Sequence, residues 1–322
     1  MMTANRQDTP AGTATKDAAG PNTRCGFIAL AGAPNAGKST LLNRLIGTKI
    51  SIVTPKIQTT RSRITGIAVE GKVQTIYIDT PGIFAPRRRL DRAMVAAAWS
   101  GMADADVTVV LVDAKASAGK RGVDKDTRSI VEGLKKKRRQ AVLAVNKIDL
   151  VPRPALLGLA AALNDEGVFT ETFMISALSG DGVVDLKTHL QDNLPEGPWL
   201  YPEDQISDIP MRMLAAEITR EQAFLQLHQE LPYAVAVETE SWEQRGDGSV
   251  RIGQVITVRR GSQKAMVLGK GGSRIKSIGA TARAELERFM ECKVHLFIHV
   301  KVRADWIDRP EHYRALGLDF DA

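Results

Sequence analysis

A glycine-rich segment near the N-terminus constrains this chain more than any other feature of its 322 residues. The segment GAPNAGKS, residues 32–39, matches the pattern of a phosphate-binding loop. A continuous apolar run, residues 24–31, precedes it, and leucines at helical spacing follow it over residues 39–46. A strand, a glycine-rich loop and a helix in succession direct backbone N–H groups and the positive end of a helix toward a phosphate. The order therefore predicts a nucleotide-binding α/β domain.

The side chains of this loop suggest how it would hold a nucleoside triphosphate. We expect Lys38 to reach the β- and γ-phosphates and the Ser39 hydroxyl to bind Mg²⁺. The glycines allow successive N–H groups to point at phosphate oxygens. The predicted phosphate-binding residues are Gly32, Ala33, Pro34, Asn35, Ala36, Gly37, Lys38, Ser39 and Thr40.

Three further motifs, DTPG, NKID and SAL, each follow a predicted strand. We expect Asp79 to hold a Mg²⁺-bound water and the Gly82 N–H to contact the γ-phosphate. Asp149 can accept two hydrogen bonds from guanine that adenine cannot supply, and a backbone N–H of SAL is placed for guanine O6. Four motifs in this order at the carboxyl ends of strands predict GTP binding. The further predicted nucleotide-binding residues are Asp79, Thr80, Pro81, Gly82, Ile83, Asn146, Lys147, Ile148, Asp149, Ser176, Ala177 and Leu178.

Segment 54–61, TPKIQTTR, lies between the first predicted helix and the second strand. GTPases place there a loop that brings a threonine to Mg²⁺ when the γ-phosphate is bound. Thr60 is our first candidate and Thr59 the second. The predicted magnesium ligands are Ser39, Thr60 and Asp79.

The predicted catalytic machinery lacks a residue that would orient the attacking water. Ile83 stands directly after DTPG, where a glutamine does this in Ras-like GTPases, so we expect slow intrinsic hydrolysis. Asn35 is a candidate to help hold K⁺ near the bridging β–γ oxygen, and Arg61 or Arg63 is the alternative source of positive charge. The predicted catalytic residues are Lys38, Thr60, Gly82 and Asn35.

Apolar runs alternate with helical stretches up to about residue 194, which predicts a doubly wound α/β fold, a P-loop G domain, over residues 24–194. Residues 1–23 are predicted to be a disordered tail and residues 195–210 a proline-rich linker. A smaller α+β domain is expected over residues 211–322. Expected strands cover 24–31, 64–69, 73–79, 107–113, 141–146, 173–176, 233–242, 250–259 and 294–303, and expected helices cover 39–46, 90–99, 124–137 and 211–230.

Positive charge gathers in the second domain. Between residues 251 and 303 there are twelve Lys and Arg against three Glu, a surplus larger than the net charge of +7 of the whole chain. This surplus favours a polyanionic partner. A second basic run, residues 135–139, is interpreted as the solvated end of a helix, with RNA contact as the alternative.

A basic GxxG loop, GKGG, lies between two helical stretches of that domain. The expected order α-β-β-α-α-β is that of a type II KH domain. Glycines allow close approach to a nucleic-acid backbone, and the basic residues neutralise phosphates, which predicts RNA binding. The predicted RNA-binding residues are Gly269, Lys270, Gly271, Gly272, Arg274 and Lys276.

The chain shows features of a cytoplasmic protein. The N-terminal residues lack the apolar core of a secretory signal, and no run approaches the roughly 18 apolar residues of a membrane span. Cys25 and Cys292 are far apart, which implies no disulfide framework. We therefore expect a reducing cytoplasm.

Together these motifs resemble the bacterial Era family. The segments that carry the resemblance are GFIALAGAPNAGKSTLLNRLIGTKISIVTPKIQTTRSRITG, YIDTPGI, AVNKID, ELPYAV and VLGKGGSRIKSIG, and it covers about residues 24–322. It implies a ribosome-assembly GTPase, expected to be a monomer, whose KH domain grips the 3′ end of the 16S ribosomal RNA of the 30S subunit. It also implies that GTP or GDP governs RNA access, and that the protein associates peripherally with the inner membrane.

Two other functions stay open at this point. A tRNA-modifying GTPase would share the G domain and the apolar residue after DTPG, but it needs a folate-binding and helical region for which we expect this length to leave no room. A nucleotide-gated RNA tether would use the same two domains but would depend little on hydrolysis. Multiple-turnover kinetics with and without small-subunit RNA would separate an enzyme from a tether.

Overall fold

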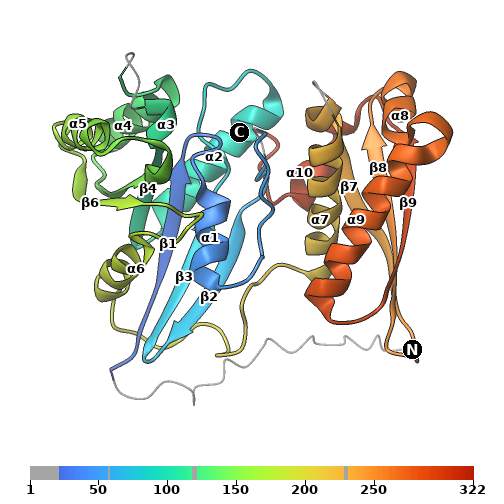
Figure 1. Cartoon of the computed structure of the whole chain (residues 1–322), viewed down its shortest axis with the longest axis horizontal. Coiled ribbons are helices and arrows are strands. Elements are labelled where there is room, and N and C mark those ends of the chain that lie inside the picture. Colours follow the sequence, from blue (N-terminus) through green and yellow to red (C-terminus); the bar gives the residue numbers. More distant parts are fainter. Residues whose placement is uncertain (1–21, 57–58, 118–121, 228–230) are drawn as a thin grey trace, which may run out of the picture.

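A computed structural model of the chain describes residues 22–56, 59–117, 122–227 and 231–322. Two units lie side by side, joined by a segment that runs between them (Figure 1). The first holds a six-stranded sheet with helices on both faces, and the second a three-stranded sheet. The fold confirms the predicted doubly wound G domain followed by a smaller α+β domain. Nearly all of the predicted tail lies outside the described residues.

The sheet of the G domain has the order β2-β3-β1-β4-β5-β6, and only β2 runs antiparallel to its neighbour. Its central strands are almost wholly buried, as apolar runs covered on both faces require. The edge strand β6 starts four residues before the predicted strand at 173, and the polar residues Thr170 and Glu171 near its start are exposed. The strands are β1 (Arg24–Gly32), β2 (Ile64–Glu70), β3 (Val73–Asp79), β4 (Val107–Asp113), β5 (Ala141–Asn146) and β6 (Phe169–Ile175).

Helices cover both faces of this sheet. Helices α1 and α6 pack on one face, and α2, α4 and α5 pack on the other. Helix α4 begins where the Asp124 carboxylate accepts hydrogen bonds from two backbone N–H groups of the first turn. The helices are α1 (Lys38–Ile46), α2 (Arg89–Asp104), α3 (Ala114–Ser117), α4 (Lys125–Lys137), α5 (Arg153–Asn164) and α6 (Val183–Asp192).

The predicted linker is attached to the G domain along its length. Isolated β-bridges join Arg24 to Glu196 and Gly66 to Ser207. The buried Gln74 side chain donates to the Tyr201 carbonyl at 2.7 Å and accepts from the Leu200 and Tyr201 N–H groups. Residues 195–210 therefore lie against the sheet, so the second unit is joined by a fixed segment.

The second unit has the type II KH order. Strand β7 pairs antiparallel with β8, and β8 pairs parallel with β9. All three long helices contribute to the apolar clusters on one face of this sheet. A short 3₁₀ turn, Leu231–Ala234, occupies the start of the strand predicted at 233. The elements are α7 (Met211–Gln226), β7 (Ala236–Gln244), β8 (Val250–Val258), α8 (Gly261–Leu268), α9 (Ser273–Met290) and β9 (Val294–Val302).

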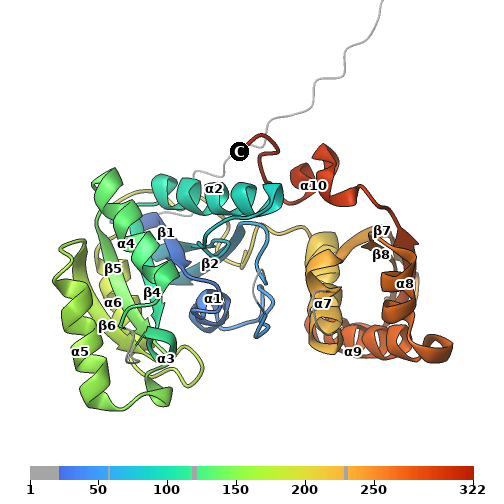
Figure 2. The ribbon, with the colours of Figure 1, turned by 90° about the horizontal axis from the view of Figure 1, so that it is seen from above.

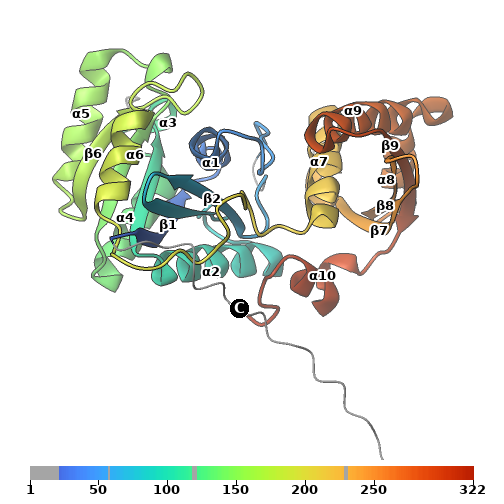
Figure 3. The same ribbon diagram turned by 90° about the horizontal axis from the view of Figure 1, so that it is seen from below.

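The C-terminal segment returns to the G domain. Helix α10 (Pro310–Ala315) lies between α2 and the KH sheet (Figures 2 and 3). Tyr313 and Leu318 are buried against Leu90 and Met94 of α2, and the Arg89 guanidinium lies 4.3 Å from the centre of the Phe320 ring. This second attachment, which the sequence did not reveal, fixes the KH domain next to the helix that follows DTPG.

Candidate nucleotide and nucleic-acid sites

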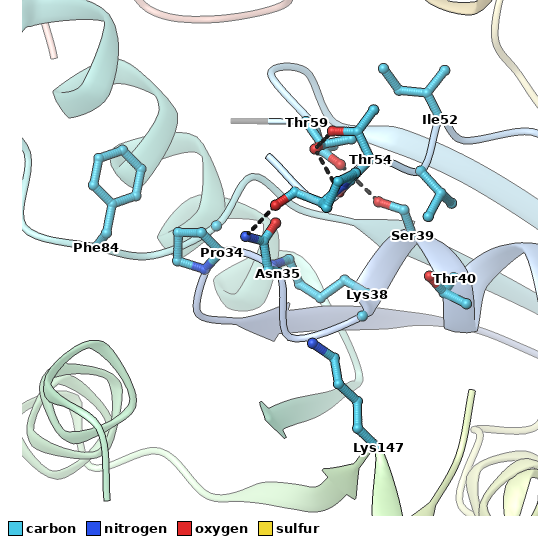
Figure 4. Close-up of a pocket in the computed structure, with 15 residues that line it drawn as sticks. Pro34, Asn35, Lys38, Ser39, Thr40, Ile52, Thr54, Thr59, Phe84 and Lys147 are labelled. Carbon is cyan, nitrogen blue, oxygen red and sulfur yellow. Dashed lines mark hydrogen bonds between the residues drawn. The ribbon is translucent and has the colours of Figure 1, made fainter. Parts of the chain in front are cut away.

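A pocket of about 300 Å³ lies between the phosphate-binding loop and the loop before β2. We name residues 49–61 the effector loop; of these, 57 and 58 are outside the described residues. Figure 4 shows Pro34, Asn35 and Lys38 on one side of the pocket and Thr54 and Thr59 on the other. Most of the lining therefore comes from the two segments that the sequence predicted to meet a triphosphate, and Gly82, Phe84 and Lys147 complete it.

Lys38 is held inside the phosphate-binding loop. Its Nζ donates to the carbonyls of Gly32 at 3.1 Å and Ala33 at 2.9 Å, and the side chain is buried. Burial lowers the pKa of Lys38 to about 8, against the opposing effect of Asp79. A phosphate at this position would stabilise the charged ammonium, so the loop is prepared for an anion.

The three predicted magnesium ligands converge. The Ser39 hydroxyl lies 2.8 Å from the Thr60 hydroxyl and donates to Asp79 Oδ2 at 2.6 Å, while Thr60 Oγ1 lies 3.2 Å from the same carboxylate oxygen. These hard oxygen groups fit Mg²⁺. The Thr59 hydroxyl instead donates to the Lys56 carbonyl at 2.6 Å, which favours Thr60 over Thr59.

Asn35 links the phosphate-binding loop to the effector loop. Its φ of 62° is left-handed, and its Nδ2 donates to the Pro55 carbonyl at 3.0 Å. The alternative charges lie elsewhere. Arg61 is buried and donates to the Val235 carbonyl of the KH domain at 2.8 Å, and Arg63 pairs with Asp104 on the surface. Neither arginine lines the pocket.

The DTPG segment approaches the phosphate-binding loop at Gly82. A Cβ at this position would lie 2.9 Å from the Pro34 nitrogen, so only glycine fits without movement. The Ile83 N–H donates to the Gly32 carbonyl at 3.1 Å, and its side chain is buried in the core. Thr80 likewise turns inward and donates to the Leu30 carbonyl. The segment therefore presents backbone, not these side chains, to the nucleotide.

In the predicted base site, Asn146 ties two loops together. Its Nδ2 donates to the Ala36 carbonyl at 2.7 Å and its Oδ1 accepts from the Ala177 N–H at 2.9 Å. The Ser176 N–H is also used, by the Asp181 carbonyl. Of the three SAL residues, Leu178 is therefore the one whose N–H makes no hydrogen bond to the described residues, and the exposed Asp149 carboxylate likewise has no hydrogen bond from them.

Several supporting residues were not predicted from the sequence. Arg44 donates to the carbonyls of Ala177, at 3.3 Å, and Leu178, which orients the SAL loop. Asn43 Oδ1 accepts from the Ile50 and Ser51 N–H groups, each at 2.9 Å, and shapes the start of the effector loop. Both residues follow the phosphate-binding loop at helical spacing, but polar residues there equally suit a solvated helix face.

The GxxG loop has a backbone that requires glycine. Gly269 has φ 72° and ψ 175°, and a Cβ there would lie 2.9 Å from the Arg274 nitrogen. Next to the loop, a groove of about 270 Å³ runs between α9 and β9. It adds unpredicted residues to the candidate nucleic-acid surface, which the folding of β9 against α9 brings together. The groove is lined by Ile275, Lys276, Gly279, Ala280, Arg283, Leu296 and Ile298.

The basic run at the end of α4 is largely occupied by internal contacts. Lys135 pairs with Glu166 at 2.5 Å, Lys137 Nζ lies 5.5 Å from the centre of the Trp99 ring, and Arg139 donates to the Ala103 carbonyl at 2.8 Å. These contacts favour a structural role over RNA contact for this run.

Comparisons with known proteins agree with both domains. Residues 27–147 match the family model described as 50S ribosome-binding GTPase, and residues 230–307 match the KH domain model. The chain is 58% identical to GTPase Era of Rhizobium meliloti (strain 1021) over 99% of this chain and 98% of that protein. It is 55% identical to GTPase Era of Brucella suis biovar 1 (strain 1330) over 98% of this chain and 99% of that protein.

Solved structures of Era share the whole fold. One is an Aquifex aeolicus Era variant bound to GDP and AlF₄⁻, and another is Era in complex with MgGDPNP and nucleotides 1506–1542 of 16S ribosomal RNA. Each is 37% identical, has a TM-score of 0.85, and aligns over 92% of this chain and 99% of its own.

The contact between Gly37 and Asn146 yields a prediction. A Cβ on Gly37 would lie 2.2 Å from Asn146 Nδ2, so Gly37→Ala should displace the side chain that joins the phosphate and base loops. Losing these bonds should weaken GTP and GDP binding by about 1–3 kcal/mol, measured by calorimetry.

Gly71→Ala is the matched control. Gly71 also has a positive φ, of 58°, but no atom lies within 4 Å of its Cβ position. It should lose stability through backbone strain, roughly 1–2 kcal/mol, and keep its nucleotide affinity. Equal affinities of the Gly37→Ala variant and the unaltered protein would contradict the role given to Asn146.

Proposed function

This chain belongs to the Era family of GTPases, and on that premise we propose that it binds GTP with Mg²⁺, hydrolyses it to GDP and phosphate, and binds the 3′ end of 16S ribosomal RNA through its KH domain. The convergence of Ser39, Thr60 and Asp79 carries the nucleotide part of this proposal. The Era structure with MgGDPNP and 16S RNA supports the rest by similarity.

The residues divide the work of phosphoryl transfer. Lys38 and the N–H groups of the phosphate-binding loop bind the β- and γ-phosphates, and Gly82 contacts the γ-phosphate through its N–H. Ser39 and Thr60 would bind Mg²⁺, with Asp79 holding one of its waters, and the ion would supply positive charge to the phosphates. Because the Ile83 side chain is buried in the core, it takes no part in orienting the attacking water.

The charge that replaces the missing glutamine comes, in this proposal, from K⁺. Asn35 lines the pocket and contacts the Pro55 carbonyl of the effector loop, so a cation near the bridging β–γ oxygen would lie between two segments that already meet. Arg61 and Arg63 do not line the pocket, which removes the support for the alternative.

RNA binding is assigned to the GxxG loop and the groove beside α9. The resemblance to Era extends the proposal to a monomer that assists assembly of the 30S subunit in the cytoplasm and contacts the inner membrane peripherally. Among the described residues, no helix is both long and apolar enough to cross a membrane. Size-exclusion chromatography would test the monomeric state, and fractionation of cell membranes would test the peripheral membrane contact.

The alternative functions differ in their support. The match of residues 230–307 to the KH family removes the support for a tRNA-modifying GTPase. A tether remains distinguishable by experiment, because multiple turnover of GTP that rises with small-subunit RNA requires an enzyme. Turnover too slow to measure in either condition would favour the tether.

Base selectivity provides one prediction. Asp149→Asn replaces an acceptor with an amide that donates where guanine also donates, so GTP affinity should fall and xanthosine triphosphate affinity should rise. Two charge-assisted hydrogen bonds imply a loss of at least about 3 kcal/mol, or roughly 100-fold. Calorimetry with both nucleotides measures this. Asp204→Asn, an exposed carboxylate of the connecting segment, should change neither affinity.

The proposed role of K⁺ provides a second prediction. We expect single-turnover hydrolysis to be faster in K⁺ than in Na⁺, and Asn35→Ala or Asn35→Asp to abolish this difference. A lost transition-state charge contact costs on the order of 2.7–4 kcal/mol, which is readily measured. Loss of the Asn35–Pro55 contact alone would slow the reaction equally in both salts. Equal rates of the unaltered protein in the two salts would exclude K⁺.

The assignment of RNA binding to the KH domain predicts how charge substitutions in the GxxG loop change RNA affinity. Lys270→Asp with Gly271→Asp places negative charge against the RNA backbone, so RNA affinity should collapse while GTP affinity stays unchanged. The slope of log affinity on log salt should also fall by about 0.7 for the lost lysine contact. The matched control is Lys136→Asp with Arg138→Asp in the basic run of α4. A larger loss of RNA affinity in this control would indicate that RNA binds at the basic run and not at the GxxG loop.

A further inference from the structure

The KH helix α7 carries charged residues that are buried although they lie on its polar face. Its apolar face contributes Leu214 and Ile218 to the KH core. Glu217, Arg220 and Glu221 nevertheless are only 8%, 2% and 3% exposed. A surface helix normally leaves such residues in water. The effector loop of the G domain contacts this charged face.

Glu221 binds the first half of the effector loop. One carboxylate oxygen accepts from the Val53 N–H at 2.8 Å, and the other accepts from Lys49 Nζ at 2.5 Å. Lys49 also pairs with Glu285 of α9. Burial acts to lower the pKa of Lys49, but its two carboxylate partners outweigh this and raise the pKa above its ordinary value. The lysine is therefore charged and held between two KH helices.

Arg220 and the end of α7 bind the second half. Arg220 donates to the Thr59 carbonyl while Glu217 holds its guanidinium at 2.7 Å. Lys56 Nζ donates to the Phe224 and Leu227 carbonyls, at the negative end of the α7 dipole. From the loop side, Arg61 donates to Val235. Both neighbours of Thr60 are thus fixed by the KH domain.

Fixing these neighbours determines where the Thr60 hydroxyl lies. Thr59 and Arg61 are held from outside, and between them Thr60 points inward to Ser39 and Asp79. We propose that Arg220 and Glu221 of the KH domain are positioning residues for GTP hydrolysis, which hold the effector loop where Thr60 reaches the Mg²⁺ site. The proposal rests on the GTPase function proposed above and adds residues from the other domain.

The chemistry of this interface suits a reversible contact. Buried ion pairs gain little over the same charges in water, because their desolvation offsets their attraction. An effector loop that left α7 would therefore expose groups that water solvates well, so the two arrangements differ little in free energy. Gln222 of α7 also donates to Glu285 at 2.8 Å, and α9 begins directly after the GxxG loop. The same contacts thus join the effector loop to the helix that carries the RNA site.

The test uses full-length Glu221→Gln and Arg220→Gln. We expect single-turnover hydrolysis to slow by about 2- to 30-fold. GDP affinity should stay within about twofold, because the effector-loop threonine contacts Mg²⁺ only when the γ-phosphate is bound. Arg220→Lys should restore part of the rate. Glu240→Gln, which alters an exposed KH pair with Lys301, is the matched control and should react at the unaltered rate.

A double-mutant cycle separates positioning from general loss of structure. Lys49→Gln and Glu221→Gln should be non-additive in the hydrolysis rate. Each single change removes one partner of the pair and lowers the thermal unfolding midpoint, whereas GDP affinity should stay nearly unchanged because the nucleotide site remains folded. Unaltered rates in the α7 variants, or equal losses of rate and GDP affinity, would overturn the proposal. An unaltered protein that fails to hydrolyse GTP would instead overturn the proposed function, so the two failures are distinguishable.

Discussion

Three hydroxyl groups, one from helix α1 and two from the effector loop, converge on one buried carboxylate, that of Asp79 at the end of β3. Ser39, Ser51 and Thr60 lie 2.6, 3.0 and 3.2 Å from its Oδ2, and the residue is fully buried. Burial raises the pKa of Asp79, and the hydroxyls together with Lys38 oppose this effect. Because a buried charge without partners is costly, this carboxylate favours the arrangement in which helix α1 and the effector loop both reach it. The same arrangement forms the proposed Mg²⁺ site.

The effector loop has a second set of contacts on its other side, and these belong to the KH domain. Thr60 faces Asp79, whereas its neighbour Arg61 extends into the KH domain and lies 5.4 Å from the centre of the Phe224 ring. A loop held from two sides cannot move at one without changing the other. The charged contacts with α7 are therefore a physical link between nucleotide chemistry and the placement of the RNA-binding domain.

The fold of the G domain and the position of each motif at the end of a strand could be predicted from the sequence, because each motif follows an apolar run whose strand carries it to one edge of the sheet. Thr60 could be chosen but not distinguished from Thr59 by spacing alone, since the choice depends on which hydroxyl faces Asp79. The contact of Arg61 with the KH domain could not be predicted from the sequence. An arginine next to the proposed Mg²⁺-binding threonine suggests phosphate contact, and only the position of the KH domain shows where it points. The attachment of α10 depends on the same long-range packing.

Because the effector loop contacts both domains, its closure and the placement of the KH domain are thermodynamically coupled. If the contacts of Arg220 and Glu221 favour the effector loop in its closed position, the closed loop must favour this placement of the KH domain by the same free energy. A γ-phosphate that draws Thr60 to Mg²⁺ would then stabilise the KH placement, and an RNA that binds this placement best would stabilise GTP over GDP. The size of either effect is limited by the difference between the closed and open interfaces. An interface of paired charges keeps that difference small, which allows each ligand to reverse the effect of the other.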